Sequence, residues 1–289
     1  MASGILIVDK PEGWTSMDVC AKLRGVFHER RIGHGGTLDP MATGVLPVFV
    51  GRATRAVEFA EKSDKEYIAG LKLGVITNTQ DSSGEVLEER PVHVTREALE
   101  STLEQFRGDI LQIPPMYSAI KINGKKLYEL ARKGREVERP ARPVTIKALE
   151  LLEQQGEDLY TIKVRCTKGT YIRTLCHDVG QALGCGGCMA SLRRTMAAGF
   201  TFKDARTLEE LQSAPDPAAL LMLLEELFAD RERLVLSPTS EKRVRNGMTA
   251  VLPNVNPGEY RVYAQSGEFL ALCQAKGGKL TTIKSFFEV

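Results

Sequence analysis

The stretch GHGGTLDPMATGVL, residues 33–46, carries the residues with the clearest capacity for chemistry. Its four glycines surround one carboxylate, Asp39, which directly precedes Pro40. Proline disfavours the helical conformation of the residue before it, so Asp39 is expected on extended backbone. We expect the glycines to let the backbone of a large ligand approach, because a residue without a Cβ leaves room. Two uses of Asp39 stay open: a covalent nucleophile, or an Asp-Pro turn in which the carboxylate bonds its own backbone.

The sequence lacks the motifs of several other kinds of catalytic site. It holds no phosphate-binding loop of the Gly-x-x-x-x-Gly-Lys-Ser/Thr type, no zinc-deaminase signature and no nucleophile elbow. Cys185 and Cys188 form a C-x-x-C pair, but a zinc site needs a second pair of ligands, and the histidines show no matching spacing. The six cysteines are expected as free thiols. We therefore predict no metal and no cofactor.

Hydrophobic periodicity predicts the elements that must position these residues. Residues 65–75 alternate so that Tyr67 and every second residue after it share one strand face, and residues 169–184 follow a helical period with Arg173 in the first turn. The remaining expected elements are a strand at 4–8, a helix capped by Ser16, a helix capped by Thr95, a hairpin of 142–152 with 158–166, and an acidic helical segment at 206–232. Most of the expected strands are joined in hairpins, which favours an α+β fold with a mixed, largely antiparallel sheet flanked by helices.

The pattern changes near residue 231, where short strands separated by glycine turns begin. We therefore predict two domains, a main domain at 1–230 and a small β-rich domain at 231–289. The start of the chain lacks the basic, apolar and small-residue sections of a signal peptide, and no apolar run is long enough to span a membrane. These features predict a cytoplasmic protein without a membrane partner.

The positive charge is concentrated in one segment. The whole chain carries a formal net charge of +2, but residues 121–147 hold nine Lys or Arg against three Glu, a net of +6, so the rest of the chain sums to −4. A basic segment on a slightly acidic body predicts binding of a polyanion. A solvated helix face is the alternative.

The stretch around Asp39 closely resembles the catalytic motif of the TruB family, the bacterial tRNA pseudouridine-55 synthases. The resemblance extends over roughly residues 4–200, in family order, through DKPEGWTS (9–16), KEY (65–67), TQDSSGEV (79–86), QIPPMYSAIKINGKKLYELAR (112–132), GTYIRTL (169–175) and LRRTMAAGF (192–200). It implies a pseudouridine-synthase-like fold with a PUA-like C-terminal domain, and isomerisation of uridine 55 in the T-loop of tRNA. One segment departs from the family pattern: CGGCMASLRRT stands where an alanine and a histidine are common.

The resemblance also implies roles for single residues. Asp39 would be the nucleophile, attacking either the sugar or the base, and Arg173 would pair with it and lower its pKa. Tyr67 would stack on the target base and is a candidate for proton abstraction. The supporting and substrate-binding residues implied are His34 against the displaced loop nucleotides, Leu192 on the far side of the base, Lys10 and Pro11 as a buttress of the pocket, and Lys125, Lys126 and Lys133 in the basic insertion at 121–147.

Three functional hypotheses follow. The first is a tRNA-modifying isomerase that works as a monomer without an obligate protein partner and also assists tRNA folding. The second is a tRNA-folding chaperone or RNA-binding module that keeps the fold but performs no chemistry. The third, the catalytic subunit of a guide-RNA-directed particle, is disfavoured because the chain shows no long basic tail.

Overall fold

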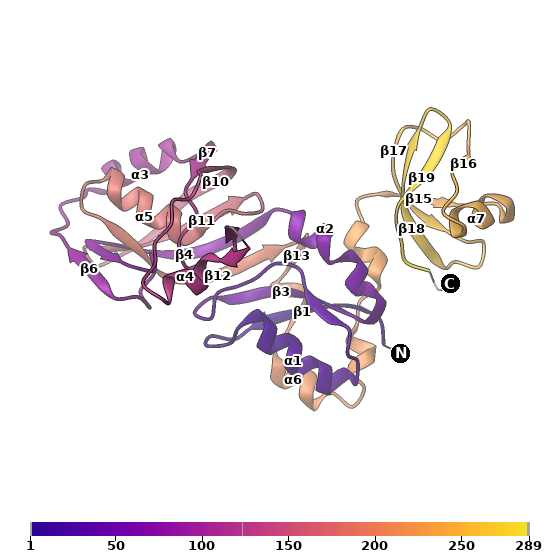
Figure 1. Cartoon of the computed structure of the whole chain (residues 1–289), viewed down its shortest axis with the longest axis horizontal. Coiled ribbons are helices and arrows are strands. Elements are labelled where there is room, and N and C mark those ends of the chain that lie inside the picture. The colour runs from indigo at the N-terminus through magenta and orange to yellow at the C-terminus, as the bar shows by residue number, and fades with distance from the viewer. Residues whose placement is uncertain (1, 123, 288–289) are drawn as a thin grey trace.

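Two sheets organise the protein in the computed structural model, which describes residues 2–122 and 124–287. The larger sheet has ten strands within these ranges, and Figure 1 shows the smaller one standing apart from it at the C-terminal end. The spatial order of the larger sheet is β14 (Ala205–Arg206), β1 (Gly4–Lys10), β3 (Thr43–Val50), β12 (Gly187–Ala197), β4 (Lys65–Leu73), β11 (Leu159–Cys166), β10 (Arg142–Gln155) and β7 (Gly108–Gln112), with β2 (Ile32–His34) beside β3 and β13 (Phe200–Thr201) beside β12.

The strand β12 joins the two halves of the larger sheet. It runs parallel to β3 on one side and antiparallel to β4 on the other. Most other neighbours are antiparallel, while β1 and β14 are parallel. The predicted α+β fold with a mixed, largely antiparallel sheet is therefore confirmed. The predicted alternation is confirmed along β4, since Tyr67, Ala69, Leu71 and Leu73 are all buried. The strand ends at Leu73, however, and Val75, which was predicted on the same face, begins a separate strand, β5 (Val75–Thr77).

Helices cover both halves of this sheet (Figure 1). Helix α1 packs its apolar face against β1 and β3, while α3 and α5 pack over the other half. The helices are α1 (Ser16–Phe27), α2 (Val57–Lys62), α3 (Arg96–Gln105), α4 (Leu127–Ala131), α5 (Ile172–Ala182), α6 (Leu208–Ser213) and α7 (Pro238–Arg245), with short 3₁₀ turns at η1 (Gly51–Ala56), η2 (Phe202–Asp204), η3 (Pro217–Leu220) and η4 (Leu224–Phe228). Among the described residues, none of the helices combines the length and the apolar character that crossing a membrane requires.

The cap of α1 lies one residue earlier than predicted. Thr15, not Ser16, is the N-cap: its hydroxyl accepts a hydrogen bond from the Asp18 N–H at 3.0 Å, and the Asp18 carboxylate accepts one from the Thr15 N–H at 2.9 Å. This reciprocal capping box satisfies two backbone donors of the first turn. The Ser16 hydroxyl is therefore not needed for the cap, and it bonds Leu38 next to the cleft described below.

The prediction of a continuous helical segment at 206–232 was wrong. Only α6 is an α-helix there, and the rest consists of 3₁₀ turns joined by extended residues. Met222 is extended because it bonds the edge of β1: its N–H donates to the Ile5 carbonyl at 2.8 Å and its carbonyl accepts from the Ile5 N–H at 2.9 Å. Pairing to a strand thus overrides the helical propensity of this leucine-rich stretch.

The C-terminal sheet contains β15 (Glu232–Val235), β17 (Gly258–Tyr263), β18 (Phe269–Lys276), β19 (Lys279–Ser285) and β16 (Ala250–Val251), in that order. Phe228, Phe269 and Phe286 form an aromatic cluster between this sheet and the body, with ring centroids 5.3–6.2 Å apart. Such ring pairs stabilise by about 0.5–1.5 kcal/mol each beyond their burial. The small β-rich C-terminal domain is confirmed, while its boundary at residue 231 stays a prediction.

Two short hairpins complete the secondary structure: β5 (Val75–Thr77) with β6 (Val86–Glu89), and β8 (Lys121–Ile122) with β9 (Lys125–Lys126). The second hairpin leads directly into α4. Asn123, which stands between these two strands in the sequence, lies outside the described residues.

Candidate active site

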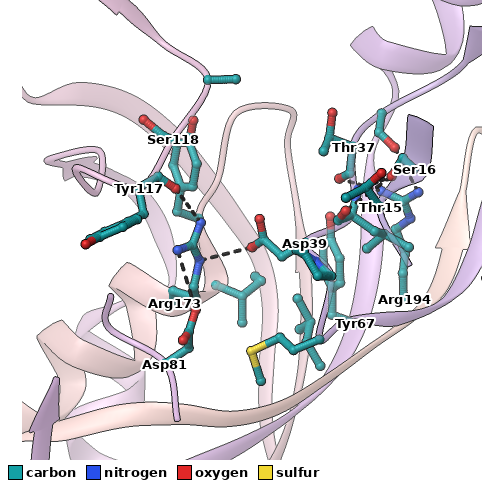
Figure 2. Close-up of a pocket in the computed structure, with 18 of the residues that line it drawn as sticks. Thr15, Ser16, Thr37, Asp39, Tyr67, Asp81, Tyr117, Ser118, Arg173 and Arg194 are labelled. Atoms are coloured by element: carbon teal, nitrogen blue, oxygen red, sulfur yellow. Dashed lines mark hydrogen bonds and ion pairs between the residues drawn. The ribbon is translucent and has the colours of Figure 1, made fainter. Parts of the chain in front are cut away.

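A cleft of about 1100 Å³ lies where the two halves of the larger sheet meet. Asp39 faces it from the loop between β2 and β3, and Figure 2 shows Arg173 and Arg194 on opposite sides of this carboxylate, with Tyr67 beside it. Arg173 comes from the first turn of α5, Tyr67 from β4 and Arg194 from β12. The structure therefore brings together Asp39, Tyr67 and Arg173, the three residues that the sequence analysis placed in the reaction.

Asp39 and Arg173 form an ion pair with 3.0 Å between Oδ2 and Nε. The Arg173 side chain is only 6% exposed, whereas that of Asp39 is 37% exposed and remains open to the cleft. Two backbone carbonyls fix the guanidinium further: Thr79 O accepts from Nη1 at 3.3 Å, and Tyr117 O accepts from Nη2 at 2.9 Å. A planar guanidinium held on three sides orients its carboxylate partner.

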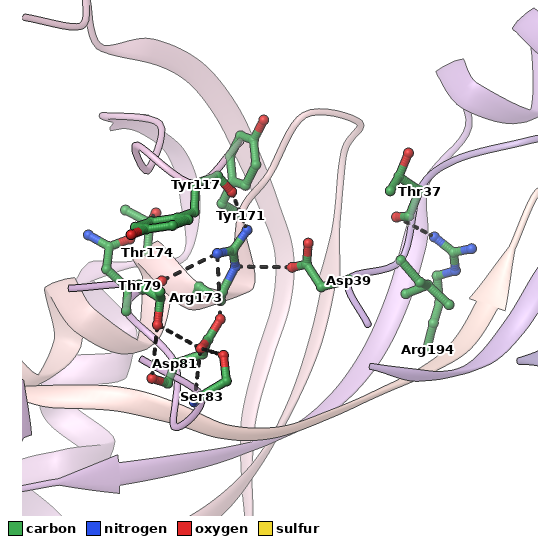
Figure 3. Close-up of polar contacts among 12 residues, drawn as sticks. Thr37, Asp39, Thr79, Asp81, Ser83, Tyr117, Tyr171, Arg173, Thr174 and Arg194 are labelled. Carbon is green, nitrogen blue, oxygen red and sulfur yellow. Dashed lines mark hydrogen bonds and ion pairs between the residues drawn. The ribbon is translucent and has the colours of Figure 1, made fainter. Parts of the chain in front are cut away.

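A second carboxylate, Asp81, shares this arginine (Figure 3). Its Oδ2 lies 3.5 Å from Arg173 Nη1, and its Oδ1 accepts hydrogen bonds from the hydroxyls of Thr79 and Ser83 at 2.7 and 2.5 Å. Asp81 also borders the cleft, but its side chain is only 5% exposed, compared with 37% for Asp39. Sequence reasoning missed this residue, although its place in TQDSSGEV, between hydroxyl side chains, indicated a bonded carboxylate.

The pKa of Asp39 is raised above its ordinary value. Burial is the largest cause; Arg173 and Lys10 oppose it, and the negative charge of Asp81 adds to it. The expectation that Arg173 holds this pKa low is therefore corrected: its effect has the expected sign, but the removal of the carboxylate from water outweighs it.

The glycines around Asp39 serve contacts within the protein. Gly44 has a φ of +104°, and a Cβ there would lie 2.3 Å from the carbonyl oxygen of Arg194 on the neighbouring strand. A Cβ on Gly35 would lie 2.5 Å from the Cβ of Ala60. At these two positions the expectation that glycine makes room for a ligand was wrong, because the chain itself occupies the space.

Two buried side chains support the Asp39 loop from below. Lys10 is fully buried, and its ammonium donates to the carbonyls of Pro11, Trp14 and Pro40 at 2.9, 2.6 and 3.2 Å. The Ser16 hydroxyl accepts from the Leu38 N–H at 2.8 Å and donates to the Leu38 carbonyl at 3.2 Å. Burial lowers the pKa of Lys10 to about 8. The structure thus places Lys10 and Pro11 behind the residues that line the cleft.

Tyr67, Leu192 and His34 all line the cleft. Tyr67 and Leu192 are each 8% exposed and lie on the adjacent strands β4 and β12. Burial raises the pKa of Tyr67, and it lowers the pKa of His34, where the charge of Arg194 acts in the same direction. His34 ends β2, and its Nδ1 is buried without a hydrogen-bond partner.

The basic segment reaches the rim of the cleft through residues that the sequence analysis did not single out. Tyr128 and Arg132, on and just after α4, line the cleft, while Lys125, Lys126 and Lys133 do not. Lys126 instead donates to the Tyr128 hydroxyl at 3.2 Å and lies over its ring. A cation over the face of an aromatic ring is attracted to it, so Lys126 helps to orient the half-buried Tyr128 ring.

The cysteines lie away from the cleft. All six are buried free thiols, and burial raises the pKa of the Cys188 thiol. Within residues 2–122 and 124–287, no group of three or more His, Cys, Asp or Glu side chains is placed to share a metal ion. The C-x-x-C pair of Cys185 and Cys188 therefore has no additional ligands nearby in this part of the chain.

Comparisons with known proteins agree with the fold and the site. Residues 24–172 match the family model of the TruB family pseudouridylate synthase N-terminal domain, and residues 173–233 match the tRNA pseudouridylate synthase B C-terminal domain. The tRNA pseudouridine synthase B of Azoarcus sp. (strain BH72) is 44% identical over 282 residues, which cover 97% of this chain and 93% of that protein. That of Stutzerimonas stutzeri (strain A1501) is 46% identical over 277 residues, which cover 93% and 90%.

A solved structure, the crystal structure of a Cbf5-Nop10-Gar1 complex, contains a chain with the same fold. It matches with a TM-score of 0.76 and 26% identity over 98% of this chain and 85% of that one. Fold, site and sequence thus define a pseudouridylate synthase. The chain belongs to the TruB family, as its sequence motifs predicted.

Proposed function

We propose that this enzyme isomerises uridine 55 in the T-loop of tRNA, with Asp39 as the nucleophile. The observation that carries the proposal is the Asp39–Arg173 pair, which keeps one carboxylate fixed and open to a large cleft. The reaction breaks the N1–C1′ bond, turns the base and forms a C5–C1′ bond. The base loses the C5 proton and N1 gains one, so atoms balance without an oxidant or reductant.

The remaining cleft residues suit the handling of a base that has left its stack. Tyr67 and Leu192 offer apolar surfaces on either side of it, and stacking on an aromatic ring contributes about 1–3 kcal/mol per base. Because burial raises the pKa of Tyr67, the ring carries a neutral hydroxyl at physiological pH. This favours stacking over proton abstraction as its role. The lowered pKa of His34 likewise favours a neutral imidazole, suited to stacking against the opened loop.

The basic segment 121–147 is proposed to hold the T-stem phosphates, and the PUA-like domain at 231–289 to contact a more distant part of the tRNA. We further propose that the protein acts as a monomer in the cytoplasm, where tRNA is found, without an obligate protein partner. Opening and releasing the T-loop would also assist tRNA folding. The similar solved chain comes from a Cbf5-Nop10-Gar1 complex, and we do not extend that assembly to this protein.

The test is incubation of the purified chain with unmodified tRNA transcript, followed by mapping of pseudouridine at single-nucleotide resolution. We expect product at position 55 and none in a transcript with cytidine there. The molar mass of the active fraction, measured by light scattering, tests whether the protein acts as a monomer. Binding without product would leave the chaperone hypothesis, and product only at other positions would contradict the proposed substrate site.

A further inference from the structure

Arg194 is the largest of the fully buried side chains, with 1% of the residue exposed, although arginine is rarely buried without a charged partner. It sits on β12, directly opposite Tyr67 on β4 and beside Gly44 on β3. No carboxylate within the described ranges lies within ion-pair distance of its guanidinium. The sequence motifs that include Arg194 predicted no role for it.

The guanidinium is bonded to backbone carbonyls on both sides of Asp39. Nη1 donates to Thr37 O at 3.4 Å (Figure 3). Nε donates to Val45 O at 2.7 Å, and Nη2 donates to Gly36 O at 3.1 Å. Two of these carbonyls precede Asp39 in the loop, and the third follows it in β3. One side chain therefore joins both ends of the segment that carries the nucleophile.

The same guanidinium lies next to two side chains of the cleft. The pKa of Tyr67 is raised by burial, and the positive charge of Arg194 opposes that rise. The pKa of His34 is lowered mainly by burial, and the charge of Arg194 lowers it further. Because Tyr67 and Arg194 are opposite residues of neighbouring strands, their side chains project to the same face. Arg194 thus contacts the loop and also borders the residues proposed to hold the base.

We propose that Arg194 is a positioning residue for the reaction: its bonds to Gly36, Thr37 and Val45 hold the loop in the conformation that presents Asp39 to Arg173 beside Tyr67. This inference rests on the proposed function. Three different nitrogens of the Arg194 guanidinium each bond one of these carbonyls, whereas a lysine ammonium bonds only carbonyls that converge on its single nitrogen, as those around Lys10 do. Charge alone is therefore insufficient for the role.

The test compares Arg194→Met, which removes charge and donors, with Arg194→Lys, which keeps the charge. Arg193→Met and Arg193→Lys are matched controls, because Arg193 is the adjacent residue of the same strand, points to Asp9 and Thr43, and does not line the cleft. Single-turnover rates at saturating tRNA and tRNA dissociation constants are measured well below the melting temperature of each variant.

We expect the rate to fall at least about 100-fold in Arg194→Met and about 10-fold in Arg194→Lys. The dissociation constants of both variants should stay within about threefold of wild type. A lower rate with unchanged affinity would show that the defect lies in the bound complex. The Arg193 variants should stay within about threefold in rate. A folded Arg194→Met with a near wild-type rate would overturn the inference. If that variant does not fold, a wild-type rate for Arg194→Lys does so instead. Absence of product from the wild type would refute the proposed function and this inference with it, whereas product from the wild type and unchanged rates of the Arg194 variants would refute this inference alone.

Discussion

The cleft and the basic segment 121–147 both carry concentrated charge, but they hold it in opposite ways. In the cleft, Arg173 is 6% exposed, paired with two carboxylates and bonded to two carbonyls. In the basic segment, Lys125 on β9 and Lys133 in the turn after α4 are exposed and lie outside the cleft lining. Charges fixed out of water orient a reacting group, whereas exposed charges attract a polyanion and are screened by salt. We therefore expect substitutions in the cleft to change mainly the reaction rate, and substitutions in the basic segment to change mainly the affinity for tRNA.

The largest expected effect is that of Asp39→Asn, which keeps the size of the side chain and removes its charge and nucleophilicity. We expect no detectable pseudouridine, with tRNA affinity changed by less than about tenfold, or about 1.4 kcal/mol. Product mapping and a binding titration at one salt concentration measure both. Activity above a few per cent of wild type would exclude the covalent role of Asp39.

His34→Ala should have a smaller effect, because the imidazole is proposed to support opened nucleotides and not to react. Loss of one stacking surface corresponds to about 1–3 kcal/mol, or roughly 5- to 150-fold in kcat/KM. The defect should be smaller on an isolated T-stem loop, where less structure must open. His93→Ala, an exposed histidine outside the cleft lining, is the control. Equal defects on full tRNA and on the stem-loop would place His34 in the chemistry instead.

Replacement of Lys125, Lys126 and Lys133 together by Gln should weaken binding and leave the rate at saturation unchanged. For every phosphate that is no longer neutralised, the plot of log affinity against log salt flattens by roughly 0.7–0.9. The control replaces Lys22, Lys62 and Lys203, which are exposed outside the cleft lining, so that the same number of charges is removed. A slope as steep as that of wild type would show that the segment is only a solvated surface.

The smallest expected effect concerns stability. Since the pKa of folded Asp39 is raised above 3.8, the folded state binds this proton more tightly than the unfolded chain, and stability falls as the pH rises from 3.8 through the folded pKa. Asp39→Asn should therefore melt at a higher temperature than wild type at pH 7, by a margin that narrows as the pH falls. Asp18→Asn should have the opposite sign, because hydrogen bonds to Thr15 lower the pKa of that carboxyl. Identical melting curves of Asp39→Asn and wild type across this range would contradict the raised pKa.

The sequence predicted most of the strands and part of the site. Alternation along β4 and β11 reflects burial, which is local information, so these elements were found from the pattern alone. The resemblance to a family supplied the pairing of Asp39 with Arg173, which no local pattern contains. The purpose of Gly35 and Gly44 was misjudged, because it depends on Ala60 and Arg194, which approach them only in the folded chain.

The position of Arg194 in the sequence does carry a signal of its burial. It lies two residues after the buried Leu192 on β12, so the strand alternation alone puts an arginine at a core position. Its charge is typical of a surface residue, yet a buried arginine indicates bonds to carbonyls or carboxylates. Its partners in the Asp39 loop are about 150 residues away in sequence, so no local pattern identifies them.

The bonds that hold the Asp39 loop bear on which molecule changes its shape when enzyme and RNA meet. The N–H groups of Gly35, Leu38 and Ala42 donate to Pro47 O, the Ser16 hydroxyl and Asp39 O. Amides bonded in this way exchange with solvent deuterium slowly, unlike those of most loops. We therefore expect the reactive segment to behave as part of the rigid framework. The enzyme would then act as a fixed template, and the nucleic acid would change its shape more than the loop does.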